Sequence, residues 1–132
     1  ARAGVDVLAE RKKEQDPIPT FREAAMRVHE EHKKGWKNGK HQTQWLATLK
    51  SYVFPHFGST LVSDVQVSQI RDALIEIWLE KPETARRVRQ RIGAVLDWSF
   101  VKGYRSTEAP MRSISRGLPR QPKRTTHFAA MP

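Results

Sequence analysis

The chain has 132 residues, of which 38% are hydrophobic, a length that suits one domain with its own core rather than two domains. Its net charge of +10 favours an anionic partner, either nucleic acid or an anionic membrane surface. The sequence has no apolar run long enough to span a membrane and opens with no signal peptide, so we expect a cytoplasmic protein without a membrane partner. The lack of cysteine excludes disulfides and thiolate metal sites.

The first part of the chain is a short mixed helical stretch that ends in two closely spaced prolines, Pro17 and Pro19. Proline favours extended backbone in the residue before it, so this pair is typical of a linker. The few apolar residues that precede the prolines cannot form a core alone. We therefore interpret residues 1–19 as the tail of a preceding domain and a linker.

The first helix of the main domain is predicted to begin after Thr20, because threonine is a good N-cap and Glu23 completes a capping box three residues later. Gly35 is predicted to end this helix, with Trp36 folding back onto the core. The buried stripe is predicted to consist of Phe21, Ala24, Ala25, Val28 and His32.

Two histidines of this first helix, His29 and His32, are spaced closely enough to hold a metal ion together. The sequence offers no third ligand nearby, and such histidines are far more often surface or boundary residues. We therefore predict neither a metal nor a cofactor.

A second helix is predicted from Lys40 to Val53, after a turn at Asn38-Gly39. The region around it is basic, with no Asp or Glu between His32 and Ser63. Free N–H groups and the helix dipole favour anions at such a helix start, which makes it a candidate phosphate-binding element. An ordinary lysine-rich surface explains any single lysine equally well. The candidate contact residues are Lys37, Lys40, Thr43, Gln44 and Lys50.

Pro55 is predicted to stop the second helix within a compact apolar turn formed by Phe54, Phe57 and Gly58. A third helix is predicted from Val67 to Leu79. Its charged residues are mostly acidic, so we expect this helix to face away from any nucleic acid.

The longest predicted helix, from Lys81 to Lys102, is the most informative stretch of the chain. Pro82 suits a first helical turn, and Gly103 is placed to end the helix. Residues 81–91 contain five basic residues and one acidic residue, which indicates a surface for an anionic polymer, although a solvated basic face is the simpler alternative. The core face is predicted to consist of Ala85, Val88, Ile92, Val95, Leu96 and Ser99. The candidate contact residues on the other faces are Thr84, Arg86, Arg87, Gln90 and Arg91.

The chain after Tyr104 is rich in proline and arginine and contains few apolar residues. This composition predicts a mobile basic linker rather than a packed element. The main helical domain is therefore predicted to span residues 20–108, followed by a basic linker over residues 109–132 that leads toward a catalytic domain absent from this chain.

Six stretches of the sequence together resemble the core-binding domain of phage-type and prophage tyrosine recombinases, or integrases. They cover roughly residues 20–132 in the family's order, so no single short motif carries the resemblance. Residues 1–15 also resemble the end of the small domain that precedes this module in prophage integrases. The six stretches are TFREAAMRV, the helix start at Lys40–Trp45, LKSYVFPHFG, LVSDVQVSQIRDAL, ETARRVRQRIGAVLDWSFVKG and HFAAMP.

The resemblance implies an all-α fold, a four-helix SAM-like bundle with flanking linker segments. Such a module holds one face of double-stranded DNA at the core recombination site while a catalytic domain holds the other, during integration or excision of a mobile element. The implied partners are double-stranded DNA, the catalytic domain and further recombinase protomers on the DNA. The positions that match DNA contacts of the family are Lys40, Thr43, Thr84, Arg87 and Arg91.

Catalysis in that family requires a tyrosine nucleophile together with arginines, a lysine and a His-x-x-Arg motif that stabilise the reacting phosphate. None of the five histidines of this chain is followed by arginine three residues later. Tyr52 and Tyr104 are predicted to be packing residues. We therefore expect no catalytic residue and no enzymatic activity in this fragment, and a tyrosine recombinase as its parent.

Two other classes of protein stay open at the level of sequence. A free-standing helical DNA-binding regulator would need a dimer interface and a helix-turn-helix. An RNA-binding or protein-interaction bundle is the other alternative, and an RNA reader would be expected to expose aromatic side chains. Trp36, Trp45 and Trp78 are instead predicted on core faces, and only Trp98 lies toward an outer flank.

Overall fold

The computed structural model describes residues 17–36 and 39–121. Within these residues the chain forms six α-helices and one short 3-10 helix, with no β-structure beyond an isolated bridge between Thr20 and Leu61. The predicted all-α class is therefore confirmed. The elements are α2 (Phe21–His32), η1 (Lys33–Gly35), α3 (Gly39–Tyr52), α4 (Phe54–Phe57), α5 (Val67–Trp78), α6 (Pro82–Val101) and α7 (Met111–Arg116).

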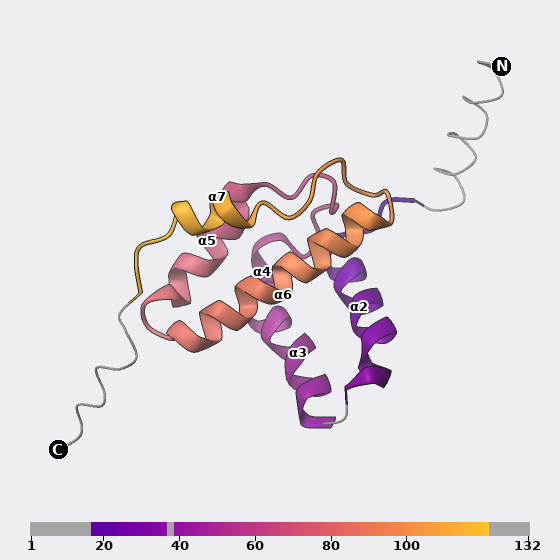
Figure 1. Ribbon diagram of the computed structural model, residues 1–132, viewed down its shortest axis with the longest axis horizontal. Helices are drawn as coiled ribbons and strands as arrows, with labels where there is room; N and C mark the ends of the chain where they lie inside the picture. The colour runs from indigo at the N-terminus through magenta and orange to yellow at the C-terminus, as the bar shows by residue number, and fades with distance from the viewer. Residues whose placement is uncertain (1–16, 37–38, 122–132) are drawn as a thin grey trace, which may run out of the picture.

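Helix α6 is the central element of the bundle. It runs across the molecule, with α2 and α3 on one side and α5 and α7 on the other (Figure 1). It packs against α2, α3 and α5, because its apolar residues recur at three- and four-residue steps and so share one helical face. The predicted core face is confirmed, since the buried residues of α6 include Ala85, Val88, Ile92, Val95, Leu96 and Ser99.

Both ends of α6 also follow the sequence signals. Pro82 occupies the first turn, where a missing N–H is tolerated. The helix ends just before Gly103, whose φ of 84° lies in the left-handed region that glycine adopts without steric cost. The backbone N–H of Tyr104 then bonds to the carbonyl of Ser99 at 2.8 Å, which turns the chain back toward the bundle.

The start of α2 is fixed by the predicted capping box. The Thr20 hydroxyl accepts the backbone N–H of Glu23 at 3.1 Å, and the Glu23 carboxylate accepts the Thr20 N–H at 3.0 Å. The rest of the predicted stripe is buried, but His32 is exposed, which corrects that part of the prediction. The reason is that η1, which follows, contributes no buried residue and so gives the last turn of α2 no core to pack against.

The predicted apolar turn around Pro55 is in fact a short helix, α4. Proline is tolerated in a first helical turn, so Pro55 helps to begin α4 rather than only ending α3. Phe57 is buried and meets Phe21 edge-on, with ring centroids 4.9 Å apart. A Cβ atom at Gly58 would lie 2.8 Å from the backbone of Phe54, so only glycine fits this close approach.

The described part of the segment after Tyr104 packs onto the bundle, so the prediction of a mobile, unpacked linker is wrong there. Ile114 of α7 is fully buried and Leu118 is 8% exposed. Met111, Ile114 and Leu118 fall at three- and four-residue steps, but this pattern among arginines and prolines is too short to predict a helix from sequence. In the structure all three pack against the core. That the segment leads toward a catalytic domain stays a prediction.

Side chains of α5 and α6 also bind the backbone of this segment. The Arg71 Nε donates to the carbonyl of Gly117 at 3.0 Å, and the Trp78 indole N–H donates to the carbonyl of Pro119. Such bonds give partners to backbone carbonyls of a segment that has little regular structure of its own. They fix its course beside α5 and α6.

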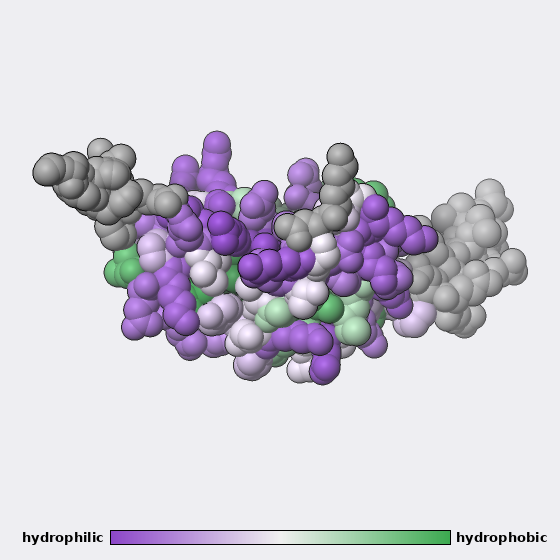
Figure 2. Space-filling view, turned by 90° about the horizontal axis from the view of Figure 1, so that it is seen from below, coloured by the Kyte–Doolittle hydropathy of each residue, from purple (hydrophilic) through white to green (hydrophobic). Residues whose placement is uncertain are grey.

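Four of the predictions lie wholly or partly outside the described residues. These concern the tail at residues 1–16, the contact residue Lys37, the turn at Asn38 and the final residues 122–132. Among the described residues, no helix is both long and apolar enough to cross a membrane. On the face of the molecule shown in Figure 2, hydrophilic side chains predominate and hydrophobic ones form only small areas.

Candidate nucleic-acid interface

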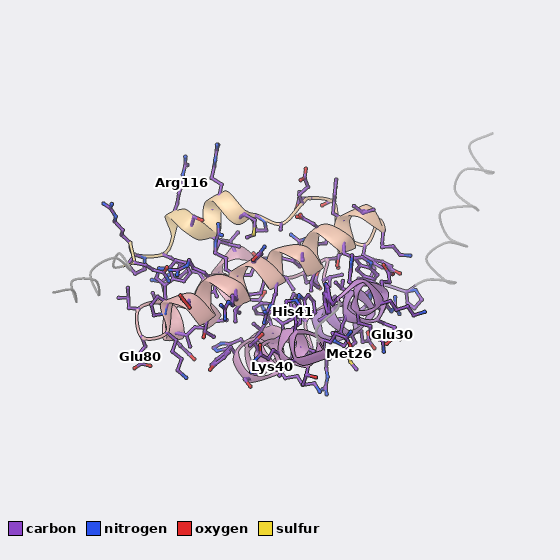
Figure 3. The ribbon with its side chains drawn as sticks, turned by 60° about the horizontal axis from the view of Figure 1, so that its bottom comes forward. Met26, Glu30, Lys40, His41, Glu80 and Arg116 are labelled. Carbon is purple, nitrogen blue, oxygen red and sulfur yellow. The ribbon has the colours of Figure 1, made fainter. Side chains whose placement is uncertain are left out.

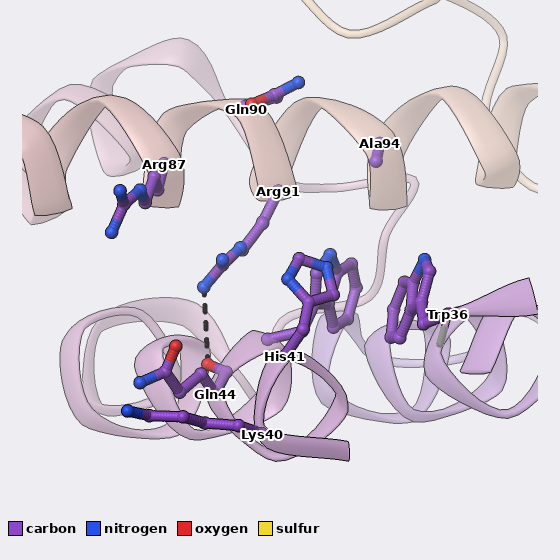
Figure 4. Close-up of a pocket in the computed structure, with 9 residues that line it drawn as sticks. Trp36, Lys40, His41, Gln44, Arg87, Gln90, Arg91 and Ala94 are labelled. Atoms are coloured by element: carbon purple, nitrogen blue, oxygen red, sulfur yellow. Dashed lines mark hydrogen bonds between the residues drawn. The ribbon is translucent and has the colours of Figure 1, made fainter. Parts of the chain in front are cut away.

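Helices α3 and α6 enclose two adjoining cavities, of about 490 and 270 Å³. Gln44, Arg87 and Arg91 line both cavities, and together the two form what we call the α3–α6 cleft. Figure 4 shows the larger cavity. Neither cavity has an Asp or Glu among its lining residues. The larger cavity is also lined by Trp36, Lys40, His41, Trp45, Gln90 and Ala94, and the smaller by Ala47, Thr48, Ser51, Tyr52 and Thr84.

Six of the predicted contact residues line this cleft. They share it because three- and four-residue steps keep side chains on one face of each helix, and the packing of α3 against α6 turns the two polar faces toward each other. The six are Lys40, Gln44, Thr84, Arg87, Gln90 and Arg91.

The other described candidates lie elsewhere. Thr43 and Lys50 are exposed on α3 but line neither cavity, because each is rotated by about 100° or more from Gln44 around the helix axis. The hydroxyl of Thr43 donates to the carbonyl of Gly39 at 3.2 Å instead. Arg86 lies on a different side of α6 from Arg87, and its guanidinium bonds to the side chain of Gln121.

Arg91 connects the two walls of the cleft. Its Nη1 donates to the hydroxyl of Thr48 at 2.7 Å and to the carbonyl of Gln44 at 3.3 Å, both on α3. Burial lowers the pKa of the Arg91 guanidinium from its ordinary value, and the positive charge of Arg87 lowers it further. The group stays protonated, but its charge is stabilised less well than in water, which an anion in the cleft would correct.

Arg87 is the more open of the two arginines. Its side chain is 64% exposed, and its Nη2 lies 4.0 Å from a carboxylate oxygen of Glu83 one turn earlier. A contact of this length between exposed groups is weak. Arg87 therefore presents most of its hydrogen-bonding capacity to whatever enters the cleft.

The family to which these features belong follows from a comparison with known proteins. The model of the phage integrase central domain matches residues 21–115, which include every residue that lines the cleft. The chain belongs to this family.

The relatives agree with this assignment. The integrase of Enterobacteria phage P4 is 26% identical over 133 aligned positions, which cover 98% of this chain and 29% of that protein. A solution NMR structure of a protein from Nitrosospira multiformis is 46% identical, with a TM-score of 0.65, and covers 70% of this chain and 88% of that one. The chain thus spans less than a third of the length of the phage P4 integrase.

A second NMR structure shares the fold at lower identity. It is a fragment of the E. coli protein IntS, which is described as a phage integrase. It is 17% identical, has a TM-score of 0.64, and covers 84% of this chain and 87% of that fragment. The all-helical arrangement is thus that of an integrase central domain.

One end of the cleft in this integrase domain is aromatic, which was not predicted from the sequence. Trp36 and Trp45 lie with ring centroids 5.7 Å apart, and His41 meets Trp36 edge-on at 4.9 Å. Trp36 was predicted to fold onto the core, and it does pack there, but it also lines the larger cavity. The sequence did contain a signal for this aromatic end. Lys40 and His41 lie one helical turn before Gln44 and Trp45, which places two polar side chains beside two aromatic ones on α3.

The two tyrosines of the integrase domain take part in packing. Tyr104 is buried, and its hydroxyl accepts from Arg27 at 3.2 Å. Tyr52 is half-buried, and its hydroxyl accepts from Lys81 at 3.2 Å. Within the described residues, no group of three or more His, Cys, Asp or Glu is arranged to hold a metal ion.

Proposed function

We propose that this chain binds double-stranded DNA along the α3–α6 cleft, as the DNA-binding module of a site-specific tyrosine recombinase. The observation that carries the proposal is the convergence of Lys40, Arg87 and Arg91 on one cleft that no carboxylate lines. A phosphodiester placed there would screen the repulsion between the two guanidinium groups and restore the solvation that Arg91 loses by burial.

The side chains of the cleft differ in the contacts that they would make with DNA. Lys40 would act as a point charge on the backbone, whereas the planar guanidinium of Arg87 would bind either phosphate or the edge of guanine in two places. Gln90 is exposed on the adjoining part of α6 and has the amide that reads adenine. Most of the affinity would come from phosphate contacts, since few of the lining residues are good readers of bases.

The integration or excision of a mobile element would then be the activity of the longer parent protein. In that protein the catalytic domain and further protomers would act on the same DNA. We infer that the fragment binds without cutting, because both tyrosine hydroxyls are held in side-chain bonds within the bundle. A covalent adduct between this fragment and a nicked suicide duplex, seen by denaturing electrophoresis, would contradict this inference.

The experiment that tests the binding proposal compares three fluorescent probes of equal length by anisotropy: duplex DNA, single-stranded DNA and duplex RNA. We expect the DNA duplex to bind most tightly, at a dissociation constant of about 10⁻⁶ M, which lies at the tight end of the range for binding driven by phosphate contacts. Equal or tighter binding of the single strand would instead assign the aromatic end of the cleft to base stacking. Absence of binding to all three probes would favour a protein partner.

A further inference from the structure

Helix α7 and the residues that follow it, together called the α7 segment (residues 111–121), carry a second group of arginines that the proposed function does not use. Arg112, Arg116 and Arg120 are all exposed and follow one another at four-residue spacing. Residues 109–121 contain no Asp or Glu. No ion pair within the described part of the chain involves any of the three arginines.

The inward side of α7 is firmly held, so these arginines are carried by an ordered element. Ile114 is fully buried against the core. From α6, Arg89 Nη2 donates to the carbonyl of Met111 and to the hydroxyl of Ser115. A side chain on an ordered support loses less conformational entropy on binding than one on a loose chain.

The end of the segment is held as well, next to the beginning of α6. The amide of Gln121 donates to the carbonyls of Trp78 and Pro82, at 2.9 and 3.2 Å, and its oxygen accepts from Arg86. The α7 segment is thus tied down at both ends, with its basic side turned outward. Arg116 projects away from the body of the molecule in Figure 3.

The outer side of α7 and the α3–α6 cleft are separate surfaces. In Figure 3, Lys40 and His41 lie on α3 on one side of α6, and Arg116 lies on the other; Figure 1 shows α7 and α3 on these same two sides. Helix α5 packs beside α7, but its two carboxylates lie against other side chains. Asp72 lies 3.5 Å from Arg71, and Glu76 lies 3.3 Å from His56.

We propose that Arg112, Arg116 and Arg120 form a second phosphate-contact surface, which holds a different stretch of duplex DNA from the one in the cleft. One domain would then bridge two DNA segments. Duplex DNA carries about one negative charge per 1.7 Å of helix axis, so a row of arginines meets phosphates in any register along it. This inference rests on the proposed function of the cleft, because bridging requires both surfaces.

The test uses the 132-residue chain with two short duplexes, one labelled with a fluorescence donor and the other with an acceptor. We expect energy transfer between the duplexes when the wild-type chain is added at low salt. Sedimentation should show that the complexes giving this transfer contain one protein chain. The double variant Arg112→Ala/Arg116→Ala should lose this transfer. It should still bind a single duplex with an affinity reduced by less than about tenfold, because the cleft is intact.

The matched control is Arg22→Ala/Lys102→Ala, which removes the same charge from two exposed positions on neither surface. It should keep the transfer. Circular dichroism would establish that both variants are folded. The proposal is overturned if the wild type gives no transfer, if the α7 variant keeps it, or if the control loses it equally. In each case, anisotropy of the α7 variant with a single duplex reports separately on the cleft, because the cleft is intact in this variant and two of the three outer arginines are gone. Binding of the α7 face to an acidic protein rather than DNA would appear as absence of transfer.

Discussion

On the side of α6 that faces α7, Arg86 and Arg89 hydrogen-bond to the protein itself, through Gln121, Met111 and Ser115. On the side that faces α3, Arg87 stands open at the cleft. All three side chains come from within four residues of one helix. Arginine thus stabilises the fold on one side of α6 and is a candidate ligand contact on the other side.

The difference follows from what each side of the helix meets. The carbonyls of Met111, Gly117 and Pro119 accept from side chains of α5 and α6, and an arginine with several donors suits this role. On the α3 wall, the carbonyl of Gln44 and the hydroxyl of Thr48 accept from Arg91, whereas Arg87, whose contact with Glu83 is weak, keeps donors for an outside group. Arg91 stands between the two cases, because it both ties α3 to α6 and lines the cleft.

The largest expected effect is a loss of stability on truncation of a core residue of α6, which lies between the two sides. Ile92 is fully buried, so Ile92→Ala should lower the free energy of unfolding by about 2–5 kcal/mol. Thermal or urea unfolding followed by circular dichroism measures this. Val101→Ala is the control, because Val101 is 80% exposed and its truncation should cost little. Similar losses for both variants would contradict the packing of α6.

Arg87→Ala tests the open side. Duplex affinity should fall by about 1–3 kcal/mol if the side chain reads a base and by less if it meets only phosphate, with the unfolding midpoint nearly unchanged. The control is Arg22→Ala, which removes the same charge from an exposed position on α2. Equal losses of affinity would mean that only the net charge matters and not the cleft.

Arg91→Ala should affect both properties, which distinguishes it from Arg87→Ala. Loss of the bond to Thr48 should cost about 0.5–1.5 kcal/mol of stability, and duplex affinity should fall as well. Arg91→Lys should keep the charge but not both bonds to α3, so affinity should recover more than stability. A variant that binds less tightly but melts like the wild type would show that Arg91 does not hold the cleft together.

Arg86→Ala has the smallest expected effect on DNA and tests the internal side. Stability should fall by about 0.5–1.5 kcal/mol through the lost bond to Gln121. Duplex affinity should fall less than in Arg87→Ala. Hydrogen exchange of the Trp78 indole N–H, which bonds to Pro119 nearby, would report the loosening of the segment. A larger loss of affinity than in Arg87→Ala would reverse the assignment of the two sides.

Features set by neighbouring residues could be predicted from the sequence. The capping box at Thr20, the stripe around Ile92 and the end of α6 at Gly103 each depend on residues within a few positions of one another. The same periodicity predicted correctly that Thr84, Arg87 and Arg91 lie off the core. These signals depend only on nearby residues, and the structure confirms the features that they predicted.

The positions that could not be predicted depend on elements distant in sequence. Arg86 and Arg87 are adjacent, and nothing in α6 itself shows that Gln121 returns to bond the first of them. Burial of Ile114 likewise depends on the surface that α5 and α6 offer to α7, because the helical spacing of Met111, Ile114 and Leu118 covers only about two turns.

The salt dependence of duplex binding tests the central claim, that the α3–α6 cleft holds DNA phosphates, most directly. Lys40, Arg87 and Arg91 are the cations that line the cleft, so if each meets one phosphate, log K against log salt should have a slope of about −3 for the wild type. The double variant Lys40→Ala/Arg87→Ala should make the slope shallower by about 2, because each lost phosphate contact removes roughly 0.9. A double variant whose slope equals that of the wild type would place the DNA on another surface and contradict the account.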